Sequence, residues 1–320
     1  MSGPGAELPL PAGFTAGHWT DREAETGCTV VLPPEGSACG VDVRGGGPGS
    51  RETEIISPLA NAQEATAVLL TGGSAYGLAA ADGVARWCEE RGRGYATPGG
   101  LVPLVPAAVI YDLIAGDASV RPGPAEGYAA CEAAASDVPE RGRVGAGTGA
   151  AVAKAGGREH ATPGGVGYAA AKLGTGEVVA ALAVVNATGD VVDADGTPLA
   201  RPRVGGGEGP SSAELIASMP GPPAWASGES RDSTTLVCVV TDAALDKLAA
   251  NKVARMAAAG VPRAIDPVYT PFDGDITFCL SGGGAGAEGA PSWRVLSVGT
   301  LGATVTAAAI RDAIRSANPA

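Results

Sequence analysis

The sequence predicts a mixed α/β protein in which helices cover sheets. Hydrophobic residues make up 45% of the 320 residues, which is enough for a substantial core and indicates a globular chain. Continuous apolar runs, typical of strands buried on both faces, occur at 67–71, 178–186 and 236–241. Helical patterns lie between several strands, and this order favours stacked layers of sheets and helices.

The first third of the chain is predicted to contain three strands and one helix. The short apolar runs 28–32 and 40–44 flank a Pro-Pro-Glu-Gly turn, which predicts two strands of a hairpin or meander. Residues 67–71 are predicted as a buried strand that runs into the glycine-rich turn 72–77, and a helix is expected over 78–90. Strand, turn and helix form one α/β unit.

The remaining elements are predicted from the same signals. Further strands are expected at 103–113, 178–186, 236–241, 276–280 and 293–298, and further helices at 127–136, 243–259 and 301–316. Residues 201–232 are rich in Gly, Pro and Ser and are predicted as a flexible linker, with a short helical pattern near 213–218. We therefore expect a single domain over 1–320.

Charge and composition exclude several classes of partner. The formal net charge is −12 and the basic residues form no run, which argues against nucleic acid and anionic membranes. No apolar stretch reaches 18 residues, and the N-terminus lacks the charged and apolar regions of a signal peptide. The six cysteines are scattered, as expected for reduced thiols, so we predict a cytoplasmic protein. Its richness in Gly and Ala favours a homo-oligomer.

The common hydrolase, nucleotide and metal motifs fit poorly. Only His18 and His160 could serve a Ser-His-Asp triad, and the segment 72–76 misses the nucleophile-elbow pattern because Tyr76 stands where a glycine belongs. The glycines at 145–150 loosely match a dinucleotide fingerprint, but the preceding Arg-Val is a poor strand. Two histidines and scattered cysteines do not indicate a metal site. No cofactor and no metal are therefore predicted.

A second kind of nucleophile needs no histidine. At Ser233-Thr234 a polar segment changes into an apolar, β-branched run, and a cut between these two residues would make Thr234 a chain terminus. The α-amine of Thr234, with an intrinsic pKa of about 7.7–8, could then act as base for its own hydroxyl. Asp273 and Asp275 stand two apart at another strand entrance, where both could orient Thr234. Alternatively, the threonines simply open a strand and Asp-Gly-Asp makes a turn.

Motifs along nearly the whole chain resemble one family of self-processing aminopeptidases. The matching segments are Gly17–Asp21, Val41–Gly46, Leu70–Leu78, Ala108–Asp112, Gly145–Gly147, Val185–Asn186, Thr234–Leu236 and Phe272–Asp275. The family includes the D-aminopeptidase DmpA, the β-peptidyl aminopeptidases and the nylon-oligomer hydrolase NylC. The number and order of these segments identify the family but not a substrate.

The resemblance implies a fold, a cleavage site and a set of active-site residues. The fold would be a four-layer α/β/β/α sandwich, and the precursor would be cut into an α chain, 1–233, and a β chain, 234–320. Thr234 would be the nucleophile and Asp273 and Asp275 its acidic pair, and further matching positions are Lys154, Asn186 and Tyr111. Tyr76 is predicted to line the substrate pocket. Ser233 departs from the asparagine that Thr-type relatives usually have before the nucleophile, which bears on the rate and place of the cut.

The prediction is therefore a self-cleaving N-terminal-threonine amide hydrolase without a cofactor. Its expected substrates are short peptides or peptide-like amides, attacked through an acyl-enzyme. One alternative is endo-hydrolysis of 6-aminohexanoate (nylon) oligomers. Another is an uncut, inactive protein that serves as a binding or scaffold module. The predicted assembly is a homo-oligomer, a tetramer of αβ units or larger.

Overall fold

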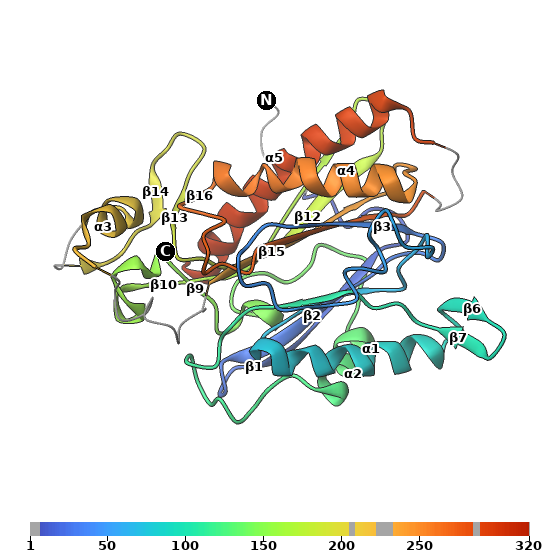
Figure 1. The fold of residues 1–320 in the computed structure, drawn as a ribbon, viewed down its shortest axis with the longest axis horizontal. Helices are drawn as coiled ribbons and strands as arrows, with labels where there is room; N and C mark the ends of the chain where they lie inside the picture. The colour runs from blue at the N-terminus through green and yellow to red at the C-terminus, as the bar shows by residue number, and fades with distance from the viewer. Residues whose placement is uncertain (1–6, 205–208, 222–232, 284–288, 320) are drawn as a thin grey trace.

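Two five-stranded sheets stack face to face, and a pair of helices covers the outer face of each sheet (Figure 1). The computed structural model describes residues 7–204, 209–221, 233–283 and 289–319. The layers run helix, sheet, sheet, helix, so the predicted four-layer α/β/β/α fold is confirmed.

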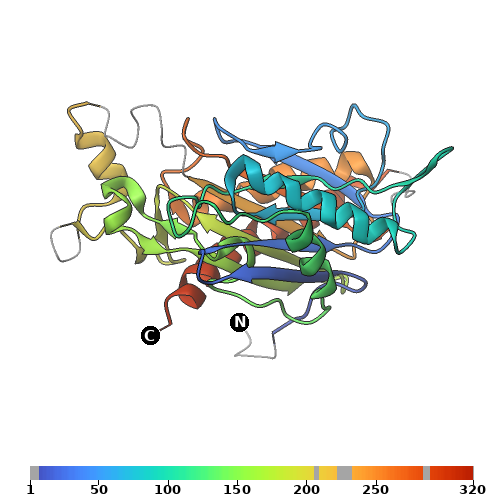
Figure 2. The ribbon, with the colours of Figure 1, turned by 90° about the horizontal axis from the view of Figure 1, so that it is seen from below.

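The first sheet contains mostly N-terminal strands. In spatial order they are β1 (Thr15–Asp21), β2 (Thr26–Leu32), β5 (Val68–Thr71), β8 (Ala107–Val109) and β4 (Ser50–Arg51). Only the β5–β8 pair is parallel. Helices α1 (Ala80–Glu89) and α2 (Pro124–Glu132) lie side by side over its outer face, as Figure 2 shows from below.

The second sheet contains the strands on which the predicted site depends. Their order is β11 (Gly165–Lys172), β12 (Val178–Asn186), β15 (Thr234–Thr241), β17 (Ile276–Ser281) and β3 (Ala38–Val43). Strand β15 pairs antiparallel with β12 and parallel with β17. Helices α4 (Lys247–Ala258) and α5 (Ser292–Ala317) cover this sheet.

Shorter elements complete the described part of the chain. They are the strand pairs β6 (Tyr95–Thr97) with β7 (Gly100–Val102) and β9 (Ala151–Val152) with β10 (Thr162–Pro163), the small sheet of β13 (Asp190–Val192), β14 (Pro198–Ala200) and β16 (Ile265–Asp266), and helix α3 (Ser212–Ser218). Single 3-10 turns occur at η1 (Ser74–Ala79), η2 (Gly145–Gly147), η3 (Lys154–Gly156), η4 (Arg158–His160) and η7 (Val261–Arg263).

The second sheet is buried on both faces, which explains its continuous apolar strands. In β12, Val179, Ala181, Ala183 and Val185 belong to the core shared with α4 and α5. The alternate residues Ala180, Leu182 and Val184 belong to the core between the two sheets. Successive side chains of a strand point to opposite faces, so a strand between two apolar layers needs an apolar residue at every position.

Two of the expected strand arrangements were wrong. Residues 28–32 and 40–44 do not form a hairpin: β2 pairs with β1 and β5 in the first sheet, while β3 is the edge strand of the second. The turn between them carries the chain from one layer to the other. Residues 293–298 are not a strand but the first turns of α5. Six residues are too few for apolar spacing alone to separate a strand from a buried helix.

Several element boundaries also differ from prediction. The expected strand 103–113 is regular only over Ala107–Val109, and the expected helix 127–136 lies at Pro124–Glu132. Proline at the first position and a bond from the Gly123 N–H to the Glu126 carboxylate (2.9 Å) fix that earlier start. Helix α4 begins at Lys247 rather than 243, because the Asp246 side chain caps it by accepting the Ala249 N–H at 2.7 Å.

The predicted linker contains an ordered helix. Helix α3 forms where the short helical pattern was expected, and the first residue of the helix, Ser212, is fully buried. The rest of the 201–232 prediction falls partly outside the described residues, at 205–208 and 222–232. Helix α5 is long and apolar enough to cross a membrane by length and composition, but half of its most apolar window is buried against the protein.

Candidate active site

The Ser233–Thr234 bond lies where three segments of the second sheet meet. Thr234 is the first residue of β15 and faces Asn186, the last residue of β12. One residue earlier, Ser233 forms an isolated parallel bridge with Asp273, in the turn that leads into β17. The strand register therefore brings the Asp-Gly-Asp turn to the start of β15. Thr234 is only 5% exposed.

Two donors point at the carbonyl oxygen of Ser233. The Thr234 hydroxyl donates to it at 2.6 Å, and the backbone N–H of Gly274 donates to it at 2.9 Å. The Gly274 backbone packs directly against the nucleophile, since a Cβ at this position would lie 2.7 Å from Thr234 Oγ1. The Gly274 N–H is placed to stabilise the negative charge that would develop on this oxygen during attack on the carbonyl carbon.

The two carboxylates hold the backbone around Thr234. Asp275 accepts the N–H groups of Thr235 at 2.5 Å and Tyr269 at 3.2 Å, while Asp273 accepts the N–H of Thr270 at 2.7 Å. Burial, and then the charge of Asp273, raise the pKa of Asp275 to about 7. The acidic pair thus fixes the start of β15 and puts negative charge beside Thr234.

Lys154 and Asn186 form a second buried group on the other side of Thr234. The Lys154 ammonium donates to the backbone and side-chain oxygens of Asn186 at 3.1 and 3.2 Å. The Ala151 N–H donates to the same side-chain oxygen at 3.0 Å, and the Asn186 amide donates to the backbone oxygen of Tyr111 at 3.3 Å. These bonds fix the orientation of the amide. The Lys154 cation also opposes the rise in the pKa of Asp275.

The backbone before Lys154 is strained. Ala153 has φ of 58°, in the left-handed region that costs a non-glycine residue roughly 1 kcal/mol. Its N–H donates to Gly189 O at 3.0 Å, and the N–H of Lys154 donates to Thr188 O at 2.9 Å. Lys154, which follows this residue, reaches Asn186 with its side chain, and backbone strain of this kind is common at functional sites.

The structure brings most of the sequence-predicted residues together. Contacts connect Lys154, Asn186 and the backbone oxygen of Tyr111 on one side of Thr234, and Asp273 and Asp275 lie on the other.

Tyr76 lies apart from this network. It is 60% exposed on η1, with the Arg121 guanidinium 3.9 Å from the centre of its ring. Its part in substrate binding stays a prediction.

Two groups at the site were missed by sequence reasoning. One is the N–H of Gly274, which the Asp-Gly-Asp spacing could have suggested. The other is Thr188, whose hydroxyl lies 2.5 Å from the Ser233 hydroxyl. No motif marks Thr188, because its position depends on how the chain turns after β12.

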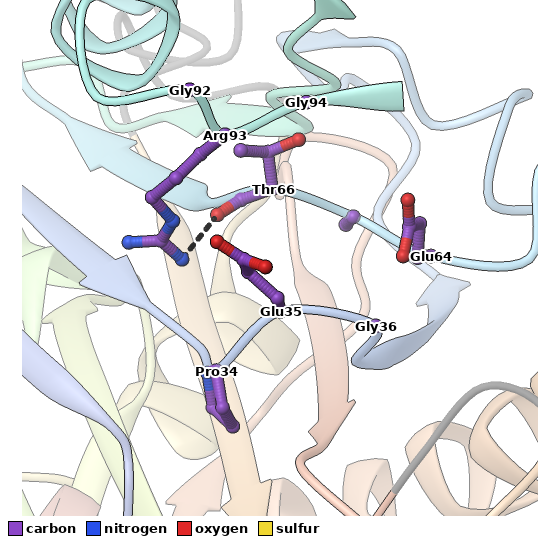
Figure 3. A pocket seen from close by; sticks show the side chains of 9 residues that line it. Pro34, Glu35, Gly36, Glu64, Thr66, Gly92, Arg93 and Gly94 are labelled. Carbon is purple, nitrogen blue, oxygen red and sulfur yellow. Dashed lines mark hydrogen bonds between the residues drawn. The ribbon is translucent and has the colours of Figure 1, made fainter. Parts of the chain in front are cut away.

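A hollow of about 180 Å³ elsewhere on the molecule is a poorer candidate. Figure 3 shows Glu35, Glu64 and Arg93 around it, with Arg93 donating to the backbone oxygen of Thr66 at 3.5 Å. Arg93 also donates to the backbone oxygen of Pro33. The lining holds none of the predicted site residues, so this hollow is separate from the group around Thr234.

Known proteins resemble this chain over most of its length. The model of peptidase family S58 matches residues 12–320. An uncharacterized aminopeptidase of Mycobacterium tuberculosis is 41% identical over 96% of this chain and 93% of its own length. A 6-aminohexanoate-oligomer endohydrolase of Agromyces sp. is 32% identical over 83% of this chain and 71% of its own length.

Solved structures share the fold at lower identity. The L-aminopeptidase D-Ala-esterase/amidase of Ochrobactrum anthropi, described as a variant of the Ntn hydrolase fold, superposes with a TM-score of 0.72 at 21% identity. That match covers 98% of this chain and 89% of the other. A Burkholderia sp. beta-aminopeptidase gives a TM-score of 0.69 at 20% identity over the same shares. The chain therefore belongs to peptidase family S58 and is a hydrolase with the N-terminal-nucleophile fold.

Proposed function

We propose that the chain cuts itself between Ser233 and Thr234 and then hydrolyses amides with Thr234 as an N-terminal nucleophile. The observation that carries this proposal is the position of the Thr234 hydroxyl, 2.6 Å from the oxygen of the carbonyl that it would attack. The Gly274 N–H holds that oxygen from a second direction at 2.9 Å. Attack at this carbonyl carbon would transfer the Ser233 acyl group from nitrogen to Oγ1, and water would open the resulting ester.

The cut would supply the base that the precursor lacks. Before cleavage the nitrogen of Thr234 is an amide, whereas afterwards it is an amine with an intrinsic pKa of about 7.7–8. Asp273 and Asp275 would stabilise the ammonium that forms when this amine takes the hydroxyl proton. Lys154 would supply positive charge near the oxyanion, and the Asn186 amide could stabilise the same charge after exchanging its bond to Tyr111 O.

The proposed substrate class is short peptides or peptide-like amides with a free amino end. The 41% identical aminopeptidase of M. tuberculosis supports this class over 96% of the chain. The second candidate is endo-hydrolysis of 6-aminohexanoate oligomers, supported by 32% identity to the Agromyces enzyme over 83% of the chain. The cytoplasmic location and the oligomeric assembly stay predictions.

The first test is the intact mass of the purified chain under denaturing conditions. We expect two fragments, 1–233 and 234–320, from the wild type and from Thr234→Ser, which keeps a hydroxyl. Thr234→Ala should stay whole and inactive. A cut, active Thr234→Ala protein would refute the mechanism, and a wild type that stays whole on long incubation would favour the scaffold alternative. The cut enzyme is then assayed with aminoacyl 4-nitroanilides and with 6-aminohexanoate oligomers, which separates the two substrate classes.

A further inference from the structure

Thr188 and Ser233 form a buried pair of hydroxyl groups at the proposed cleavage site. Their Oγ atoms lie 2.5 Å apart, and both residues are at most 5% exposed. Sequence motifs do not mark Thr188, and the proposed reaction gives it no role.

Contacts from two other segments fix the position of Thr188. Its backbone oxygen accepts the Lys154 N–H at 2.9 Å and the hydroxyl of Ser212, the first residue of α3, at 3.3 Å. Ser212 is in turn held by Asp190, which accepts its hydroxyl at 2.5 Å and its N–H at 3.0 Å. Thr188 is therefore a preorganised group, and its hydroxyl points at whatever side chain occupies the place of Ser233.

Ser233 is held at both of its polar groups. The side-chain hydroxyl meets Thr188, while the carbonyl oxygen accepts from Gly274 and Thr234. The place that Ser233 occupies is thus an enclosed subsite in which Thr188 contacts the side chain and Gly274 and Thr234 contact the carbonyl. The side chain is fully enclosed, so the subsite fits a small residue.

The self-cleaving reaction and the hydrolysis of a substrate share one intermediate. In self-cleavage, Thr234 Oγ1 bonds to the carbonyl carbon of Ser233, the C–N bond breaks and the hydroxyl proton ends on the nitrogen. The product is an ester with Ser233 as its acyl residue. A substrate amide attacked by Thr234 gives the same kind of ester, with the substrate's own residue in place of Ser233. Water then opens either ester, leaving a carboxylate and restoring the hydroxyl.

We propose that Thr188 is a specificity-determining residue that favours a small, hydroxyl-bearing acyl residue, first in the chain itself and then in substrates. This inference rests on the proposed function. It predicts that amides of serine are better substrates than amides of alanine, which lack only the hydroxyl. A site built to bond a hydroxyl discriminates against the analogue without one, because a buried polar group is left unpaired.

The test compares kcat/KM for L-serine and L-alanine 4-nitroanilides. The enzymes are the self-cleaved wild type, Thr188→Val, which has nearly the same shape without the hydroxyl, and Thr188→Ser, which keeps it. We expect the wild type and Thr188→Ser to prefer serine about tenfold, and Thr188→Val to lose the preference. The ratio of two substrates on one preparation does not depend on how much protein is folded or cut. An unchanged ratio in Thr188→Val overturns the proposal, as does a wild type without preference.

Self-cleavage gives a second readout that needs no added substrate. Thr188→Val and Ser233→Ala should each slow the cut about tenfold, and the double variant should be no slower, because both remove the same bond. If the slowing in the double variant is the product of the two single effects, Thr188 does not act through Ser233 and the proposal is overturned. The proposal is also overturned if Thr188→Ser, which keeps a hydroxyl, cuts as slowly as Thr188→Val. A wild type that neither cuts itself nor hydrolyses amides would instead refute the proposed function.

Discussion

Replacing Gly274 with alanine tests whether the bond geometry at Ser233 drives the cut. The added Cβ would lie 2.7 Å from Thr234 Oγ1, where ordinary contacts begin near 3.4 Å. The backbone at Gly274 is not in the left-handed region, so alanine fits it without torsional strain. The hydroxyl or the turn must then shift by several tenths of an ångström, away from the 2.6 Å contact with Ser233 O. Because a misplacement of about 1 Å lowers a rate by about 100-fold, this smaller shift should slow the cut by up to about that factor.

The assay is a time course of intact mass after the chain is purified or refolded. Gly174→Ala is the matched control, since nothing lies within 4 Å of the added Cβ, and it should cut at the wild-type rate. Thermal unfolding of both variants shows whether Gly274→Ala still folds. If folded Gly274→Ala cuts as fast as the control, the contact between this turn and the hydroxyl is not important for cleavage.

Three further predictions concern stability and are measured by urea unfolding in the uncut Thr234→Ala background. The raised pKa of Asp275 means that the folded chain keeps a proton that the unfolded chain loses, so this residue lowers the free energy of unfolding as pH rises from about 4 to 7. Asp275→Asn should remove up to about 4 kcal/mol of this change in the free energy of unfolding. If the free energy of unfolding depends on pH as it does in the parent protein, the raised pKa does not belong to Asp275. Burial lowers the pKa of His18 to about 4, so His18 destabilises the fold as pH falls from about 6.5 to 4. In His18→Gln the free energy of unfolding should fall by about 3 kcal/mol less over this pH range. If both proteins lose the same amount of stability, His18 is not the group that titrates. Gly167→Ala would place a Cβ 2.0 Å from the backbone oxygen of Ala309, pushing α5 off β11, and should destabilise the chain by about 2 kcal/mol or more. A neutral Gly167→Ala would show that the helix shifts freely.

The sequence predicts the second sheet better than the first. Strand β12 matches its prediction residue for residue, because a strand enclosed by α4, α5 and the other sheet has to be apolar throughout. The segments 28–32 and 40–44 are also strands, but each pairs with residues far away in the chain. Short-range patterns predict such strands without their partners. The error at 293–298 has another origin, since six residues are too few for apolar spacing to separate a strand from the first turns of α5.

The site was only partly accessible from the sequence. Chemistry suggested Thr234 and the acidic pair, because a terminal threonine needs no histidine, but spacing alone equally fitted a strand opening and a turn, and the family resemblance decided between them. Lys154, Asn186 and Tyr111 were found by family resemblance alone, since a lysine, an asparagine and a tyrosine far apart in the chain carry no local signal. Thr188 was not found at all. Its contact with Ser233 exists only because the turn after β12 meets the start of β15.

The serine at position 233 is compatible with cleavage for a structural reason. The groups that hold the bond to be cut are the Gly274 N–H, the Ser233 carbonyl and the Thr234 hydroxyl, and none of them is a side-chain atom of residue 233. That side chain instead faces Thr188, and the two hydroxyl oxygens lie 2.5 Å apart, which leaves room only for a short side chain at 233. A longer asparagine would have to displace Thr188, which Lys154 and Ser212 hold in place. Ser233→Asn should therefore slow the cut in this chain, and adding Thr188→Ala should restore part of the lost rate by making room, although the hydroxyl of Thr188 is then missing. Faster cutting by Ser233→Asn alone would show that the side chain at 233 helps the reaction directly.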